Sequence, residues 1–171
     1  VPHSVNAYGF ASKENRWRTH VRDENLKVWQ ENILNFYREN QGKYEESYLT
    51  GYLVHVLTDI FCDEIYQEKL YPMLVKKGLD YHTAYAYYED GIVKFENSNI
   101  DKPWWKEVKE KLTKAEVEPI CGMDEKMILD EVNYTINKYS TRTFEECGFI
   151  GEEFADLVVK KIEDKMFYTE K

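Results

Sequence analysis

The stretch that decides the fold is Leu49–Cys62, which reads Leu-Thr-Gly-Tyr-Leu-Val-His-Val-Leu-Thr-Asp-Ile-Phe-Cys. Apolar residues occur almost all the way round a helix of this sequence, and a helix that is hydrophobic on every side is buried on every side. We therefore predict a long helix over residues 44–75 that forms the buried centre of the domain. Pro72 is expected to kink or end this helix, and Gly78 to close it.

The sequence on both sides of this helix predicts further helices. Upstream, apolar residues recur at three- and four-residue steps, and Asp23-Glu24-Asn25 offers capping side chains. Asp90-Gly91 interrupts one downstream pattern and is expected to break or kink it. Strand-like alternation and short Asn-Gly or Asp-Gly hairpin turns between apolar runs are absent. The chain is therefore predicted to be all-α, a multi-helix bundle that forms a single helical domain over residues 1–171. The helices expected besides the central one cover residues 23–40, 80–96, 102–115, 124–139 and 152–166.

Composition and charge narrow the classes of function. The chain has 171 residues, 43% of them hydrophobic, so it can bury a core of its own. Its net charge of −9 argues against a sequence-independent nucleic-acid binder and, weakly, against an anionic membrane surface. No apolar run approaches the roughly 18 residues that a membrane helix needs, so no stable membrane insertion is expected. The composition does not indicate an oligomeric state.

The cysteines bear on the cellular compartment. Cys62, Cys121 and Cys147 are odd in number and lack CxxC spacing, so they predict neither a disulfide framework nor a thiolate zinc site. This usage favours a reducing, cytoplasmic setting. Because the chain begins at Val1 rather than at a methionine, secretion stays open.

His55 and Asp59 are the strongest candidates for chemistry. Residues four apart on a helix lie on one face, roughly 5 to 6 Å apart at Cβ, which suits two ligands of one metal. An ionised carboxylate in an apolar helix needs compensation, and a divalent cation shared with a histidine supplies it. Gly51, four residues before His55, would leave open space for an ion or substrate. The alternative is that His55 and Asp59 hydrogen-bond each other in the core.

Two upstream histidines add weight to the metal interpretation. His20 stands just before the first long helix, and His3 follows Pro2 in the opening loop. A lone loop histidine is more often solvated than bound to a metal. Two of them upstream of a His-x-x-x-Asp helix favour a site built from His3, His20, His55 and Asp59.

Three short segments carry a resemblance to a known family: Pro2-His3-Ser4-Val5, Thr19-His20, and Gly51-Tyr-Leu-Val-His-Val-Leu-Thr-Asp-Ile60. Together they resemble the bacterial zinc-dependent phospholipase C family, whose pattern is a Pro-Asp-Ser segment, a Ser/Thr-His pair and a G-Y-x-x-H-x-L-T-D helix. The resemblance covers roughly residues 1–75, and only the third segment is specific. Residues 76–171 show no signature of the family.

The resemblance implies a phospholipase C-like fold and a zinc site within residues 1–75. It implies that His20, His55 and Asp59 are zinc ligands and that position 3 supplies the remaining one. The family has aspartate at position 3, which can bridge two metals, whereas His3 binds one, so one zinc ion is expected rather than a cluster. The family also uses a histidine upstream of its Pro-Asp-Ser segment, which this sequence does not contain.

The function expected from these residues is a metal-dependent hydrolase that acts on a small-molecule or lipid phosphoester through metal-activated water. Asp63 and Glu64, about one turn beyond Asp59, are candidates for a general base or for orienting groups, or else form the solvated end of the helix. Four protein ligands would fill a tetrahedral zinc, as in structural sites. A non-enzymatic, metal-stabilised binding protein therefore stays open, as does a helical interaction protein without metal.

Overall fold

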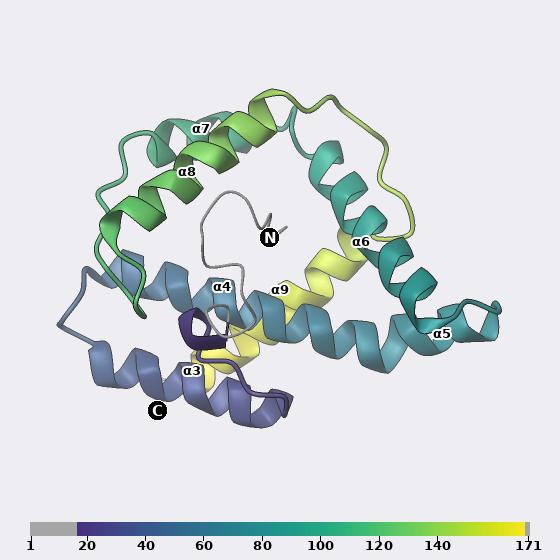
Figure 1. Cartoon of the computed structure of the whole chain (residues 1–171), viewed down its shortest axis with the longest axis horizontal. Coiled ribbons are helices and arrows are strands. Elements are labelled where there is room, and N and C mark those ends of the chain that lie inside the picture. Colours follow the sequence, from purple (N-terminus) through teal and green to yellow (C-terminus); the bar gives the residue numbers. More distant parts are fainter. Residues whose placement is uncertain (1–16, 170–171) are drawn as a thin grey trace. The chain divides into compact units, whose positions relative to one another are not determined.

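The structure is a computed structural model that describes residues 17–169, with side chains through Met166 (Figure 1). His3 lies outside the described residues. Between Trp17 and Thr169 the chain forms α-helices and no β-strand, so the all-α prediction is confirmed for this range. None of the helices within it is both long and apolar enough to cross a membrane.

The helices follow the predicted ranges closely (Figure 1). The predicted central helix over residues 44–75 is one continuous helical run made of three segments, and the helix predicted over 102–115 is shorter at both ends. The elements are α3 (Leu26–Asn40), α4 (Glu46–Ile65), a π-helical segment η1 (Tyr66–Leu70), α5 (Tyr71–Lys76), α6 (Tyr81–Ser98), α7 (Pro103–Leu112), α8 (Glu125–Ser140) and α9 (Glu152–Thr169).

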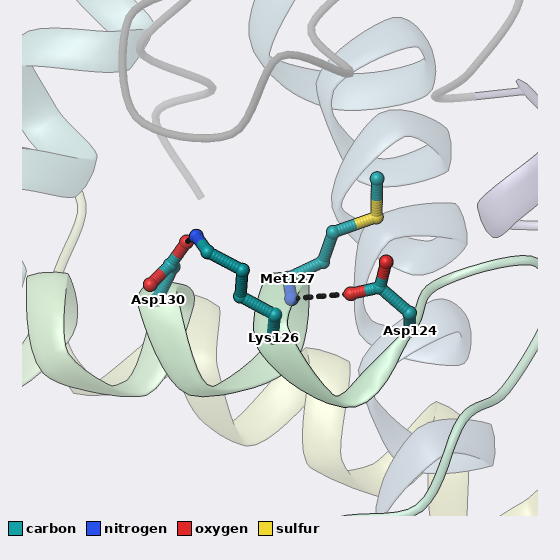
Figure 2. Close-up of polar contacts among 4 residues, drawn as sticks. All are labelled: Asp124, Lys126, Met127 and Asp130. Carbon is teal, nitrogen blue, oxygen red and sulfur yellow. Dashed lines mark hydrogen bonds and ion pairs between the residues drawn. The ribbon is translucent and has the colours of Figure 1, made fainter.

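The start of α8 shows how local sequence fixes a helix. The side chain of Asp124 precedes the helix in extended backbone and accepts a 2.8 Å hydrogen bond from the backbone N–H of Met127 (Figure 2). Such an N-cap contributes about 1 kcal/mol, because it satisfies an N–H that has no partner within the helix. One turn further on, Lys126 pairs with Asp130 in the i, i+4 arrangement that suits a helix surface.

Pro72 does not interrupt the helical run, because the backbone changes just before it. Proline lacks an N–H, and its ring clashes with the carbonyl four residues earlier in a regular α-helix. The π-helical segment Tyr66–Leu70 supplies a wider turn there, and Pro72 then occupies the first turn of α5, where a missing N–H is tolerated. The chain stays helical to Lys76 and turns at Gly78, whose φ is +88°.

The predicted break at Asp90-Gly91 is wrong. Helix α6 continues through Gly91, which is buried, and a Cβ at this position would lie 2.6 Å from Cγ1 of Ile150 and 2.9 Å from the ring of Phe149. The glycine lets a distant segment approach the helix backbone. Ile150 is fully buried there, beside Tyr66 and Tyr88 in a shared apolar core.

The described residues form two compact units. One contains those up to Leu53 together with Lys102–Arg142, and includes α3, α7 and α8. The other contains Val54–Asp101 and the residues from Thr143 onward, and includes η1, α5, α6 and α9. The division falls inside α4, which is one uninterrupted helix. The single-domain organisation stays a prediction.

Helix α4 is buried on one face only. The expected burial is confirmed for that face and is wrong for the opposite one. The opposite stripe is polar and half-buried at His55, Thr58 and Asp59, and Gly51 is exposed. Most residues between these positions are apolar, so a count of hydrophobic residues does not reveal this stripe. The buried face consists of Leu49, Leu53, Val56, Leu57, Ile60, Phe61 and Ile65, each at most 2% exposed.

Candidate metal centre

His55 and Asp59 lie one turn apart on the same side of α4, as the sequence predicts. Each is half-buried rather than fully enclosed. Gly51 lies one turn before His55, and no atom of residues 17–166 comes within 4 Å of the position that a Cβ would take. The part of the chain that the structure describes therefore leaves space beside His55, as expected there.

His20 belongs to a short turn with an unusual backbone. Trp17–Thr19 are helical, and this helix ends when the N–H of Arg22 bonds to the carbonyl of Trp17 at 2.9 Å and that of Val21 to Arg18 at 3.3 Å. This pair of bonds is the Schellman ending of a helix, which requires a left-handed residue and normally places glycine there. Here the residue is Val21, with a φ of 45°. A β-branched residue is strained in this conformation.

Side chains from α3 and α4 hold this turn in place. Three successive carbonyl oxygens, those of Thr19, His20 and Val21, each accept a side-chain hydrogen bond. The donors are Tyr52 Oη to Thr19 at 2.5 Å, Trp29 Nε1 to His20 at 2.7 Å and Asn32 Nδ2 to Val21 at 3.2 Å. Thr19 is 1% exposed. These bonds explain how the strained conformation of Val21 persists, since such backbone survives where its surroundings over-determine it.

The structure brings His20 together with the pair on α4. One ligand atom each of His20, His55 and Asp59 lies within 4.8 Å of the others, and all three residues are half-buried. Tetrahedral zinc with bonds near 2.0–2.1 Å needs ligand atoms about 3.4 Å apart, so the three atoms would have to approach one another by at most about 1.4 Å to bind an ion. Two imidazoles and a carboxylate are also a donor set that zinc and similar divalent metals take.

The ring of His20 has a neighbour that can set its tautomer. Its Nδ1 lies 3.1 Å from Oγ1 of Thr19. When Nδ1–H donates to this buried hydroxyl, Nε2 carries the lone pair and is the nitrogen that can bind a metal. Metal-binding histidines are commonly oriented in this way by a group that holds the other ring nitrogen.

The two candidate catalytic carboxylates have different surroundings. Glu64 accepts a 2.9 Å hydrogen bond from Nζ of Lys161, whose ammonium also lies 5.6 Å from the centre of the Phe61 ring. Asp63 is half-buried, and it lies near enough to Tyr85 for its charge to add to burial in raising the pKa of Tyr85 to about 12. A catalytic role for either carboxylate stays a prediction.

Cys62 lies one turn beyond Asp59 but is not part of the group of ligand atoms. Burial raises the pKa of its thiol to about 11, and a hydrogen bond with Tyr88 opposes this rise. The thiol is therefore protonated near neutral pH, whereas a metal binds the thiolate.

Three residues that hold the site escaped sequence reasoning: Thr19, Val21 and Tyr52. Thr19 and Tyr52 belong to the segments that carry the family resemblance, but the sequence assigns neither of them a role in holding the site. No local pattern marks a valine that adopts left-handed backbone. The predicted ligand His3 lies outside the described residues, so its place in the site stays a prediction.

Comparisons with protein families, with curated proteins and with solved structures found no match for this chain. The resemblance to zinc-dependent phospholipase C therefore stays a prediction that depends on the quoted segments.

Proposed function

We propose that this chain binds one divalent cation, zinc by preference, through His20, His55 and Asp59, and that it hydrolyses a phosphoester. The observation that supports the proposal is the grouping of these three ligand atoms within 4.8 Å. The sequence resemblance independently assigns the same three residues as zinc ligands. The substrate is a small-molecule or lipid phosphoester, in keeping with that resemblance.

The charges of the ligands suit an anionic substrate. Two neutral imidazoles and one carboxylate leave a dication with one net positive charge. A divalent ion at such a site supplies Lewis acidity towards a phosphoryl oxygen and lowers the pKa of a coordinated water. Thr19 would hold the His20 ring in the tautomer that binds, and Tyr52 would keep the backbone at His20 in place.

Asp63 is the better of the two candidates for accepting a proton. It lies four residues beyond Asp59 on α4, so it shares a face of the helix with that ligand. Glu64, by contrast, lies five residues beyond Asp59, and its carboxylate contacts the ammonium of Lys161 at 2.9 Å. We therefore assign Asp63 as the proton acceptor in the proposed reaction.

The ligand in the fourth coordination position decides whether a tetrahedral zinc site is catalytic or structural. If His3 fills it, the ion has four protein ligands, as in structural zinc sites. If a water molecule or the substrate fills it, the site can catalyse hydrolysis. The variant His3→Ala distinguishes these cases, because it abolishes tight binding only in the first.

Metal content is the first experiment. Untagged protein supplemented with zinc and then dialysed should hold about one zinc per chain, and His20→Ala, His55→Ala and Asp59→Ala should each hold less than about 0.2. His82→Ala is the matched control, because His82 is exposed on α6 and takes no part in the group. Wild-type protein that retains less than about 0.2 zinc per chain would remove the basis of the proposal.

Hydrolysis is the second experiment. The zinc-loaded protein should cleave a chromogenic phosphodiester, and Asp63→Asn should lower kcat by about 100-fold or more while zinc content stays unchanged. Zinc that is bound at full occupancy without any hydrolysis of soluble or micellar phosphoesters would support the metal-stabilised binding protein instead.

A further inference from the structure

A shallow cleft of about 520 Å³, widely open to solvent, lies between the 17–22 turn and α3. Its volume is in the range of small-molecule sites, which is about 300–1,000 Å³. None of the three proposed metal ligands lines it. The strained residue Val21 forms part of its wall. Strained backbone is often found at ligand-binding positions, and its presence here favours a ligand site in this cleft.

Two arginines line the cleft in a chain whose net charge is −9. The guanidinium carbon of Arg22 lies 4.6 Å from the centre of the Trp29 ring. The guanidinium of Arg18 lies against Gly122, where an added Cβ would be 2.6 Å from Nη1. Both guanidiniums thus have neighbours that fix their position. Each carries five N–H donors, so it can serve a ligand in addition to its other contacts within the protein.

The remaining walls supply apolar surface and a charge gradient. Trp17 from the turn and Phe36 from α3 present aromatic rings. Glu39 lines the cleft on α3 about 6 Å, or one helical turn, beyond Asn35. Asn32, on the same face of α3, bonds to Val21 of the 17–22 turn. Glu39 lies two turns further along α3 and is therefore farther from the 17–22 turn than Asn32 is. The cleft is therefore cationic beside the turn and acidic at its far end.

We propose that this cleft binds a small organic anion, with a phosphate or carboxylate group on Arg18 and Arg22 and an aromatic or apolar body against Trp17 and Phe36. Arginine is the side chain that best matches the two oxygens of such groups. The proposal does not depend on the metal centre, because the two sites share no residue.

The test is a titration of the full chain in the presence of EDTA, so that metal cannot contribute. Phenyl phosphate and phenylacetate are the anionic probes, and benzyl alcohol and benzylamine are the neutral and cationic ones. Binding is followed by isothermal calorimetry and by NMR shifts of the tryptophan indoles. The anionic probes should bind with dissociation constants of about 1 mM or below, as small aromatic ligands with a few good contacts do. The neutral and cationic probes should bind at least ten-fold more weakly.

Matched variants decide which residues are responsible. Arg18→Gln and Arg22→Gln should each weaken binding of phenyl phosphate about ten-fold. Arg142→Gln is the control, since Arg142 also stacks on an aromatic ring, 4.8 Å from that of Tyr139, but does not line the cleft. Glu39→Lys should strengthen binding several-fold, and because Glu39 is exposed this change leaves the fold intact. If phosphate is the preferred group, Arg18→Gln should weaken the binding of phenyl phosphate more than that of phenylacetate.

Three results would overturn the inference. The first is binding of benzyl alcohol or benzylamine as tight as that of the anions. The second is an effect of Arg142→Gln equal to that of Arg22→Gln. The third is unchanged or weaker binding in Glu39→Lys. Since each is measured without metal, failure here leaves the proposed metal centre untouched, and loss of the metal centre leaves this inference untouched.

Discussion

The hydroxyl of Tyr52 donates a 2.5 Å hydrogen bond to the backbone carbonyl of Thr19. Tyr52 lies one turn before His55 on α4, and Thr19 is the residue before His20. One bond therefore connects the backbone beside the loop ligand to the helix that carries the other two. Burial raises the pKa of the Tyr52 hydroxyl far above its usual range, so the group stays a donor at every pH at which the protein is used.

Removing this hydroxyl should loosen the metal centre. We expect Tyr52→Phe to lower the free energy of unfolding by about 1–3 kcal/mol, because the buried carbonyl of Thr19 loses its partner. We also expect it to weaken zinc binding about ten-fold, because His20 is less well positioned. Urea unfolding and competition with a chromogenic chelator measure the two effects.

Tyr48→Phe is the matched control. The Tyr48 hydroxyl donates a 2.6 Å bond to the carbonyl of Glu118, from the turn of α4 before Tyr52, but it does not touch the 17–22 turn. This variant should leave zinc affinity unchanged. Equal losses of affinity in the two variants would show that Tyr52 acts only through general stability.

The strain at Val21 should appear as a stabilising substitution. Left-handed backbone costs a β-branched residue about 1–2 kcal/mol relative to glycine, so Val21→Gly should raise the free energy of unfolding by up to about 1 kcal/mol after the loss of side-chain contacts. The same change at Val108, exposed in the middle of α7, should destabilise by about 0.5–1 kcal/mol. Thermal and urea unfolding compare the two. Destabilisation by both changes would show that Val21 is not strained.

Two helical glycines should respond oppositely to alanine. Gly91→Ala places a Cβ 2.6 Å from Ile150 in a packed core, so a loss of about 1–3 kcal/mol is expected. Gly51→Ala meets no atom within 4 Å and should stabilise α4 by about 0.5–1 kcal/mol through helix propensity alone. Urea unfolding of the two variants and the wild type gives both values. A neutral Gly91→Ala would contradict the close approach of Ile150.

Alkaline pH should destabilise the protein partly through Cys62. Burial raises the pKa of this thiol from 9.0 to about 11, so the folded state favours the neutral form. The stabilising contribution is complete below pH 9 and is lost as the pH rises from 9 to 11. Cys62→Ala should therefore flatten the fall in unfolding free energy across this window. Since the buried tyrosines also titrate there, only the difference between variant and wild type is informative, and parallel curves would contradict the assignment.

The sequence by itself determined the helices. Apolar spacing and capping side chains such as Asn25, Asp80 and Asp124 act within a few residues, and each of these three accepts a hydrogen bond at the start of its helix. The sequence alone also places His55 and Asp59 on one side of their helix, because residues four apart share a face of any helix. The break predicted at Gly91 failed because glycine weakens a helix locally, whereas here it serves a contact with Ile150, about sixty residues away.

The sequence also predicted that His20 joins the pair on α4, but only the tertiary structure showed what holds His20 in place. Its position depends on three side chains from two helices and on a left-handed valine, and none of these has a local signature. The half-burial of the ligand stripe likewise has no local signature, because the sequence around it is apolar. Local interactions set the backbone of each helix, but which helices meet, and which side chains then converge, depends on packing between residues far apart in the chain.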